Sequence, residues 1–97
     1  MTKKRTVLIT GGAKRVGKEI ALSLASKDTN LIIHYNKSIE EAKKLKLLVE
    51  DKGSKCALIK NDLSNQKNIK KVIDSSKKFF GTINCLINNA SLFLNDN

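Results

Sequence analysis

The 97-residue sequence contains no proline and no tryptophan, and it has one histidine, one tyrosine and two cysteines. The absence of proline fits a chain made almost wholly of regular elements, because proline interrupts helices and central strands. Cys56 and Cys85 lie in separate apolar runs without a CxxC spacing. We interpret them as reduced, small core residues, and we expect neither a metal site nor a disulfide framework.

Long hydrophobic runs are also missing. No apolar run approaches the roughly 20 residues that a membrane-spanning helix needs. The opening stretch, MTKKRTVLITGG, lacks the long apolar segment and cleavage site of a signal peptide. We therefore expect a cytoplasmic protein that has no membrane partner, with at most one domain and a modest core at this length.

Acidic residues are scarce, with nine Asp and Glu against 19 Lys and Arg, for a formal net charge of +10. Such an excess is compatible with nucleic-acid binding. However, the lysines are spread from Lys3 to Lys78, and aromatic residues that would stack on bases are not interleaved with them. We interpret the charge as solvated helix faces and expect no nucleic-acid partner, with a basic nucleic-acid binder as the alternative.

Short apolar runs alternate with longer segments of helical period. Four runs rich in Val, Ile and Leu predict buried strands at residues 5–10, 30–35, 55–60 and 83–88. Each intervening segment carries an apolar stripe, which indicates a helix packed on one side. The stripes are Val16, Ile20 and Leu24; Ala42, Leu45 and Val49; and Ile69, Val72, Ile73 and Phe80.

Helix ends are marked as well. Ser38 is a plausible N-cap with Glu41 as its capping-box partner, and Gly53 and Gly81 are natural helix terminators. The resulting order, β-α-β-α-β-α-β, predicts an α/β fold, a Rossmann-like, doubly wound parallel sheet with helices on both faces.

The stretch TGGAKRVG, residues 10–17, lies between the first predicted strand and the first predicted helix. Backbone N–H groups and the helix dipole form an anion site at such a junction. Gly11 allows the tight turn, and Gly17 lets the helix pack close to the strand. The setting predicts a dinucleotide-binding loop, with a purely structural turn as the alternative. A phosphate loop of the GxxxxGK[ST] kind is excluded, because Glu19 stands where the hydroxyl is required.

The end of the second strand, HYNKS, predicts which dinucleotide binds. An NAD site usually has Asp or Glu there, whereas this chain has no carboxylate before Glu40. Lys37 offers an ammonium and Ser38 a hydroxyl to a 2′-phosphate, and Lys14 on the facing loop adds a second charge. NADP is therefore favoured over NAD. The alternative is that both lysines are solvated surface residues with no role in binding. His34, a lone histidine at a strand end, is more often a packing or hydrogen-bonding residue than a catalyst.

Two further strand ends face the same predicted crevice. Asp62 is placed to accept a hydrogen bond from the adenine amino group, with Leu63 packing on the base; the alternative is an Asx turn or a helix cap. After the fourth strand, Asn89 and the small Ala90 allow the backbone to run against the cofactor ribose.

In this order and spacing, TGGAKRVG, NDLS and LINNAS resemble the N-terminal half of the short-chain dehydrogenase/reductase family over essentially the whole chain. That family usually shows TGxxxGxG and NNAG, so Arg15 replaces the middle glycine and Ser91 the last one. Both departures, together with HYNKS, resemble the pteridine reductase branch. Lys37 stands where that branch commonly has arginine, which keeps the charge but weakens stacking on adenine.

The resemblance implies an NADPH site and a substrate site. In it, the loop residues contact the pyrophosphate and the nicotinamide side, HYNKS holds the 2′-phosphate with His34 nearby, NDLS binds adenine, and NNAS binds ribose and phosphate. The implied cofactor residues are Gly11, Lys14, Arg15, Val16, Gly17, His34, Tyr35, Lys37, Ser38, Asp62, Leu63, Asn89, Ala90 and Ser91. The implied pterin-binding residues are Arg15, Ser91 and Phe93, the alternative for Phe93 being a cover of the core.

Catalytic residues are not expected in this chain. Reductases of this family protonate substrate with the tyrosine of a YxxxK motif, but Tyr35 is the only tyrosine here and Ile39 follows it at the lysine position. We therefore interpret residues 1–97 as the NADP-binding portion of a longer enzyme, inactive alone and homo-oligomeric, as a tetramer, when complete. Exposed apolar edges and helix faces predict that the chain alone is poorly stable and prone to associate.

The predicted activity is NADPH-dependent hydride transfer to a C=N bond of a pterin or dihydrofolate-type substrate. Two alternatives stay open. One is another NADP-dependent member of the family, such as a carbonyl or acyl-carrier reductase. The other is a noncatalytic nucleotide-binding module, which the missing YxxxK motif permits.

Overall fold

The computed structural model describes residues 4–13, 15–63 and 67–89. Their strands form one parallel sheet in the order β3-β2-β1-β4. The strands are β1 Arg5–Thr10, β2 Thr29–Tyr35, β3 Cys56–Lys60 and β4 Cys85–Asn88, and the helices are α1 Arg15–Leu24, α2 Ile39–Asp51 and α3 Lys67–Phe80. The predicted Rossmann-like α/β order is confirmed.

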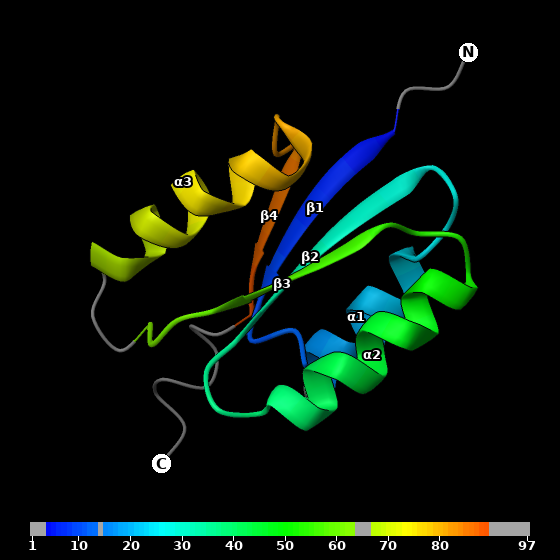
Figure 1. Ribbon diagram of the computed structural model, residues 1–97, viewed down its shortest axis with the longest axis horizontal. Coiled ribbons are helices and arrows are strands. Elements are labelled where there is room, and N and C mark those ends of the chain that lie inside the picture. The colour runs from blue at the N-terminus through cyan, green and yellow to red at the C-terminus, as the bar shows by residue number, and fades with distance from the viewer. Residues whose placement is uncertain (1–3, 14, 64–66, 90–97) are drawn as a thin grey trace.

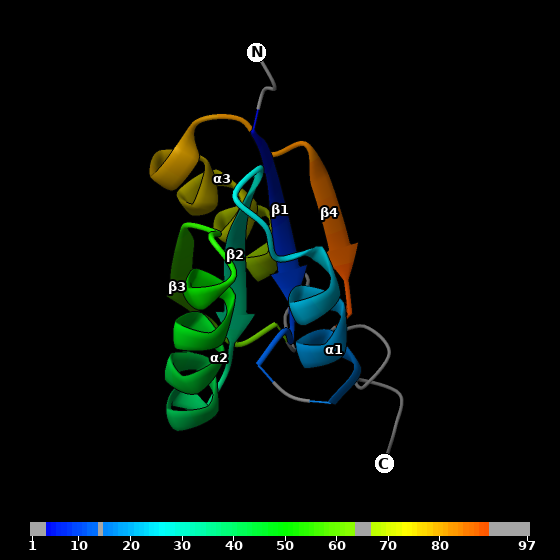
Figure 2. The ribbon, with the colours of Figure 1, turned by 90° about the vertical axis from the view of Figure 1, so that its right-hand side faces the viewer.

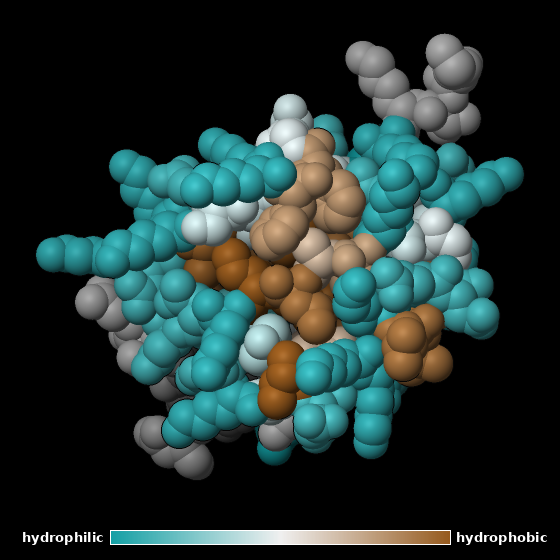
Figure 3. Space-filling model, in the orientation of Figure 1, coloured by the Kyte–Doolittle hydropathy of each residue, from teal (hydrophilic) through white to brown (hydrophobic). Residues whose placement is uncertain are grey.

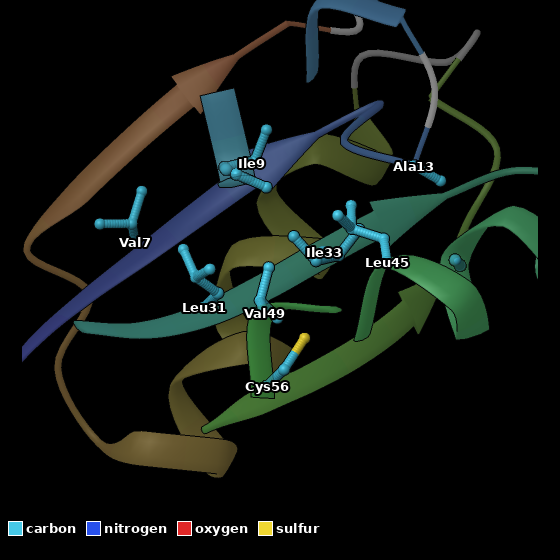
Figure 4. Close-up of a cluster of buried hydrophobic side chains, with 10 residues drawn as sticks. Val7, Ile9, Ala13, Leu31, Ile33, Leu45, Val49 and Cys56 are labelled. Carbon is cyan, nitrogen blue, oxygen red and sulfur yellow. The ribbon is translucent and has the colours of Figure 1, made fainter. Parts of the chain in front are cut away.

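The helices cover both faces of the sheet. In Figures 1 and 2, α1 and α2 lie on one face and α3 lies on the other. Alternate residues of β1 and β2 point to opposite faces, so Ile9 and Ile33 join the core under α1 and α2 whereas Leu8 and Ile32 join the core under α3. Figure 4 shows the first of these clusters, in which Leu45 of α2 lies over β2. Both faces of the central strands are thereby removed from water.

The predicted helix stripes are confirmed for α2 and partly wrong for α1. Ala42, Leu45 and Val49 are all buried. In α1, however, the buried residues are Gly17 and Ala21, and Val16 is 52% exposed. Ile20 is partly buried and packs against the core. At Gly17, by contrast, the helix lies so close to the glycine turn that no side chain fits. The exposed Val16 is thus left on the surface next to the turn. Leu24, predicted in the same stripe, is also exposed.

The helix ends follow the predictions at two glycines and differ at the start of α2. Gly53 and Gly81 adopt positive φ angles of 104° and 87° just past α2 and α3, as expected of helix terminators. Ser38 occupies the N-cap of α2, but within the described residues its side chain makes no capping hydrogen bond. The predicted capping box is therefore wrong, because Glu41 faces a pocket beside α1 instead.

Strand β4 is shorter than predicted and lies at an edge of the described sheet. Residues 83 and 84 precede it, and the side chain of Asn84 accepts a hydrogen bond from the Thr6 N–H at 2.9 Å. Cys85 is exposed at the beginning of this edge strand, so its assignment to the core is wrong. Cys56 is buried as predicted, and burial raises the pKa of its thiol to about 12.

The opposite edge, β3, carries partly buried apolar residues on both faces. Figure 3 shows an apolar strip across this side of the molecule, bordered by hydrophilic surface. The predicted exposure of apolar strand edges is present here and at Leu86 of β4. Within the described residues, no helix combines the length and the apolar character needed to cross a bilayer.

Candidate nucleotide-binding site

The carboxyl ends of the parallel strands meet at one edge of the sheet, and the turn from β1 into α1 lies there (Figure 2). Gly11 has φ 63°, a left-handed conformation that glycine adopts without steric cost. Its N–H donates to His34 Nδ1 at 2.8 Å, and its carbonyl accepts from Asn89 Nδ2 at 3.1 Å. The N–H of Gly12 donates to the backbone carbonyl of His34 at 3.1 Å. The turn is therefore fixed by β2 and by the residue after β4.

Gly17 explains how close the helix comes to this turn. A Cβ atom at Gly17 would meet the Gly11 carbonyl oxygen and would lie 2.7 Å from Gly12 Cα and 2.8 Å from Asn89 Nδ2. Two of these neighbours are backbone atoms, which cannot move aside cheaply. Only glycine allows α1 to begin here, and its N-terminal dipole is thus directed at the mouth of the turn.

Arg15 is the first residue of α1 and has φ 52°, the only positive φ at a non-glycine position among the described residues. L-residues avoid this conformation because Cβ approaches the carbonyl, at a cost of about 1–2 kcal/mol. The backbone thus retains the geometry of a glycine at a position where the chain carries arginine. Such strain is concentrated at functional sites.

A pocket of about 250 Å³ lies beside the turn, between the first turns of α1 and α2. Its only apolar lining residue, Ala13, is buried. The charged residues that line it are Arg15, Lys18, Glu41 and Lys44. Three cations against one carboxylate make the pocket suitable for an anion. The sequence interpretation missed Lys18, Glu41 and Lys44, although the three-residue spacing of Glu41 and Lys44 would have indicated one helix face.

The segment after β2 presents its polar groups to solvent. Lys37 is exposed, Ser38 is partly exposed, and Tyr35 packs partly against the core under α1 and α2. The N–H of Ile39 donates to the carbonyl of Lys37 at 3.0 Å. Because the Ser38 side chain makes no capping bond, its hydroxyl is available at the start of α2 as the 2′-phosphate hypothesis requires.

The adenine hypothesis fits Asp62 better than Leu63. Asp62 is exposed after β3, and its carbonyl accepts from Asn68 Nδ2 at 2.6 Å. Leu63 is 4% exposed and packs with Leu8, Ile32 and Val72. Because the Leu63 side chain belongs to the core, only the Leu63 backbone is placed to contact an adenine base.

Asn89 closes the site from β4. Its side chain is 1% exposed, and its Oδ1 atom is buried without a hydrogen-bond partner in the described residues. Lys14, Ala90, Ser91 and Phe93 lie outside the described residues. In the part of the chain that the structure describes, no cluster of three His, Cys, Asp or Glu residues could hold a metal ion.

These residues fit an anionic dinucleotide. Gly17 brings the α1 dipole to the turn, the adjacent pocket is cationic, and no carboxylate follows β2 before Glu40. A group with phosphates is thus met by positive charge at the turn and beside it.

Four parallel strands in this order, with helices on both faces and a glycine turn after β1, define the Rossmann-like class of α/β proteins. The family model of the short chain dehydrogenases matches residues 5–97, and the chain belongs to this family.

Solved structures and a curated relative agree with this family assignment. The chain is 37% identical to a short-chain dehydrogenase from Oenococcus oeni, with a TM-score of 0.82 over 91% of this chain and 40% of that one. It is 34% identical to FolM alternative dihydrofolate reductase 1 from Brucella canis, solved in complex with NADP, with a TM-score of 0.81 over 96% and 37%. It is 31% identical over 87 residues to the Bacillus subtilis oxidoreductase YhxC, covering 90% of this chain and 30% of that protein. The chain thus spans between 30% and 40% of the length of these proteins.

Proposed function

We propose that this chain is the NADPH-binding part of a short-chain reductase that reduces a pterin or dihydrofolate-type substrate. The observation that carries the proposal is Arg15, which holds φ 52° where the family motif has glycine. The similarity to a dihydrofolate reductase of this family solved with NADP supports it. The whole enzyme would transfer hydride from nicotinamide C4, which is the chemistry that the cofactor supplies.

Arg15 is suited to a role at both cofactor and substrate. Its guanidinium is always charged and offers five N–H donors in a planar fork. It starts at the mouth of the turn and lines the cationic pocket. From this position, the Arg15 side chain would reach either a cofactor phosphate or a planar heterocyclic substrate. A glycine at this position would remove the strain and both interactions.

The remaining residues would bind and orient rather than react. The turn and the start of α1 hold the pyrophosphate, and Lys37, Ser38 and Lys44 face the 2′-phosphate. Asp62 accepts from the adenine amino group. Val16, exposed next to the turn, covers the nicotinamide side. Holding a cofactor and a substrate in a reactive geometry is a large part of the catalysis of hydride transfer.

Nucleotide titrations test the cofactor preference. We expect Lys37→Ala to weaken NADPH binding about tenfold, since a charge-assisted bond contributes roughly 1.5–3 kcal/mol, and to leave NADH binding unchanged. Lys44→Ala should weaken NADPH binding about threefold, as expected of an ion pair at an exposed position. Lys43→Ala is the matched control, because Lys43 is an exposed neighbour that does not line the pocket. Equal losses for NADPH and NADH in Lys37→Ala would contradict the assignment.

A carbonyl reductase of the same family is the second candidate. The 37% identity to the Oenococcus oeni short-chain dehydrogenase, whose name specifies no substrate, keeps this candidate open beside the dihydrofolate reductase at 34%. The two are separated by the substrate that drives NADPH oxidation in the full-length protein carrying this sequence. A dihydropterin should be consumed and a simple aldehyde should not; the reverse result favours the carbonyl reductase.

A further inference from the structure

His34 is a buried polar residue at the nucleotide-binding edge of the sheet, and both of its ring nitrogens have hydrogen-bond partners. It is the next-to-last residue of β2 and is 3% exposed. Its Nδ1 atom lies 2.8 Å from the N–H of Gly11, and its Nε2 atom lies 2.8 Å from the carbonyl oxygen of Asn61. The ring therefore joins the turn after β1 to the segment after β3.

These two contacts fix the form of the imidazole. A backbone N–H only donates, so Nδ1 must be the acceptor; a carbonyl only accepts, so Nε2 must carry the proton. Only the neutral ring with its proton on Nε2 satisfies both partners. Burial lowers the pKa of His34 below its usual value, against a smaller opposing effect of the Asn61 carbonyl, and so favours the same neutral form.

The ring also limits what a ligand can reach. His34 takes the Gly11 N–H with its side chain and the Gly12 N–H with its backbone carbonyl. Neither N–H is then directed at a phosphate, which leaves the start of α1 as the anion-binding part of the turn. On its other side, the ring bonds the residue directly before Asp62. A single side chain thus sets the distance between the pyrophosphate and adenine ends of the site.

We propose that His34 is a positioning residue that holds the glycine turn and the Asn61–Asp62 segment in the relative position that a dinucleotide requires. The proposal rests on the nucleotide-binding function proposed above. His34 does not touch the nucleotide itself, since both ring nitrogens are engaged within the protein.

Two substitutions separate the contacts. An asparagine amide reaches the position of Nδ1 and keeps the bond to Gly11, but it is too short for Asn61. A glutamine amide reaches the position of Nε2 and keeps the bond to Asn61, but it leaves the Gly11 N–H without its acceptor. His34→Asn and His34→Gln therefore each remove one of the two connections.

The test is calorimetric titration of the full-length protein carrying this sequence with NADPH and with adenosine 2′-monophosphate, which lacks both pyrophosphate phosphates and the nicotinamide. We expect His34→Gln to weaken NADPH about tenfold and the monophosphate less than twofold, because only the turn is released. His34→Asn should weaken both ligands by the same factor, about threefold to tenfold, because the adenine segment is released. Asn30→Ala is the control: Asn30 is a buried polar residue at the other end of β2, and its loss should lower stability but neither affinity.

The outcomes are distinct. If the full-length wild-type protein binds NADPH and both histidine variants bind both ligands as the wild type does, the positioning role is wrong. If both variants lose affinity for both ligands to the same extent, and Asn30→Ala does so as well, His34 contributes only to the general stability of the fold. That result would also overturn the positioning role. Absence of NADPH binding by the full-length wild-type protein would instead reject the proposed function.

Discussion

Two sets of residues at the same edge of the sheet differ in how they are held. The buried network, Gly11, Gly12, Gly17, His34 and Asn89, is fixed by backbone hydrogen bonds and by close packing. The exposed cations, Arg15, Lys18, Lys37 and Lys44, lie at the surface beside it. The buried network therefore determines the shape of the site, and the exposed cations determine its charge. We infer that the network sets whether a dinucleotide fits and that the cations set which dinucleotide is preferred.

The largest expected effect comes from breaking the network at Gly17. Gly17→Ala should destabilise the chain by about 3 kcal/mol, because the added Cβ would overlap the backbone of Gly11 and Gly12. Urea denaturation followed by circular dichroism measures the loss. NADPH binding should be lost as well, since α1 must move away from the turn.

Gly81→Ala provides the comparison outside the network. An added Cβ at Gly81 would have no described atom within 4 Å, so its cost of about 1 kcal/mol comes only from the positive φ. Nucleotide affinity should not change. Equal destabilisation by the two substitutions would mean that the close approach of α1 to the turn is not a strong constraint.

An intermediate effect, opposite in sign for stability and function, is expected at Arg15. Arg15→Gly should leave the free energy of unfolding unchanged or raise it by up to about 1 kcal/mol, because strain is relieved while backbone entropy is lost. NADPH affinity should nevertheless fall about tenfold, and dihydropterin turnover by the full-length protein should fall further. A variant that is less stable but equally active would show that Arg15 serves the fold and not the site.

The smallest effect is a pH dependence of stability that originates in the network. Because burial lowers the pKa of His34 from its ordinary value of 6.5, the unfolded chain binds a proton more readily than the folded chain. The contribution of His34 is thus fully present above pH 6.5 and is lost as the pH falls toward the lowered folded pKa. Urea midpoints measured across this interval should fall with pH in the wild type and less steeply in His34→Asn. Identical slopes would mean that His34 is not neutral in the folded chain.

The sequence was sufficient for the fold because its strongest patterns are periodic. Four apolar runs and three helical segments gave the correct element order, and Gly53 and Gly81 end the helices as predicted. The α1 stripe was wrong at Val16 and Leu24, because periodicity does not reveal how closely a helix approaches a sheet, and at Gly17 that distance admits no side chain. Cys85 was misplaced for a similar reason, since an apolar strand gives no sign of lying at an edge.

Within the site, sequence reasoning identified chain positions but not their contacts. Gly11, Gly17 and Asn89 do meet at one point, and the unusual Arg15 does occupy a glycine conformation. The two bonds of His34 connect residues 23 and 27 positions apart, so no local pattern indicates them. The cations of the pocket come from two helices whose relative placement only the folded chain defines.

The most direct test of this division is the ratio of the dissociation constants for NADH and NADPH, measured by titration of the full-length wild-type protein and of its Lys37→Ala and His34→Gln variants. We predict that the wild type prefers NADPH, that Lys37→Ala lowers the ratio about tenfold, and that His34→Gln weakens both nucleotides while leaving the ratio unchanged. A ratio near one in the wild type, or the same change of ratio in both variants, would contradict the account.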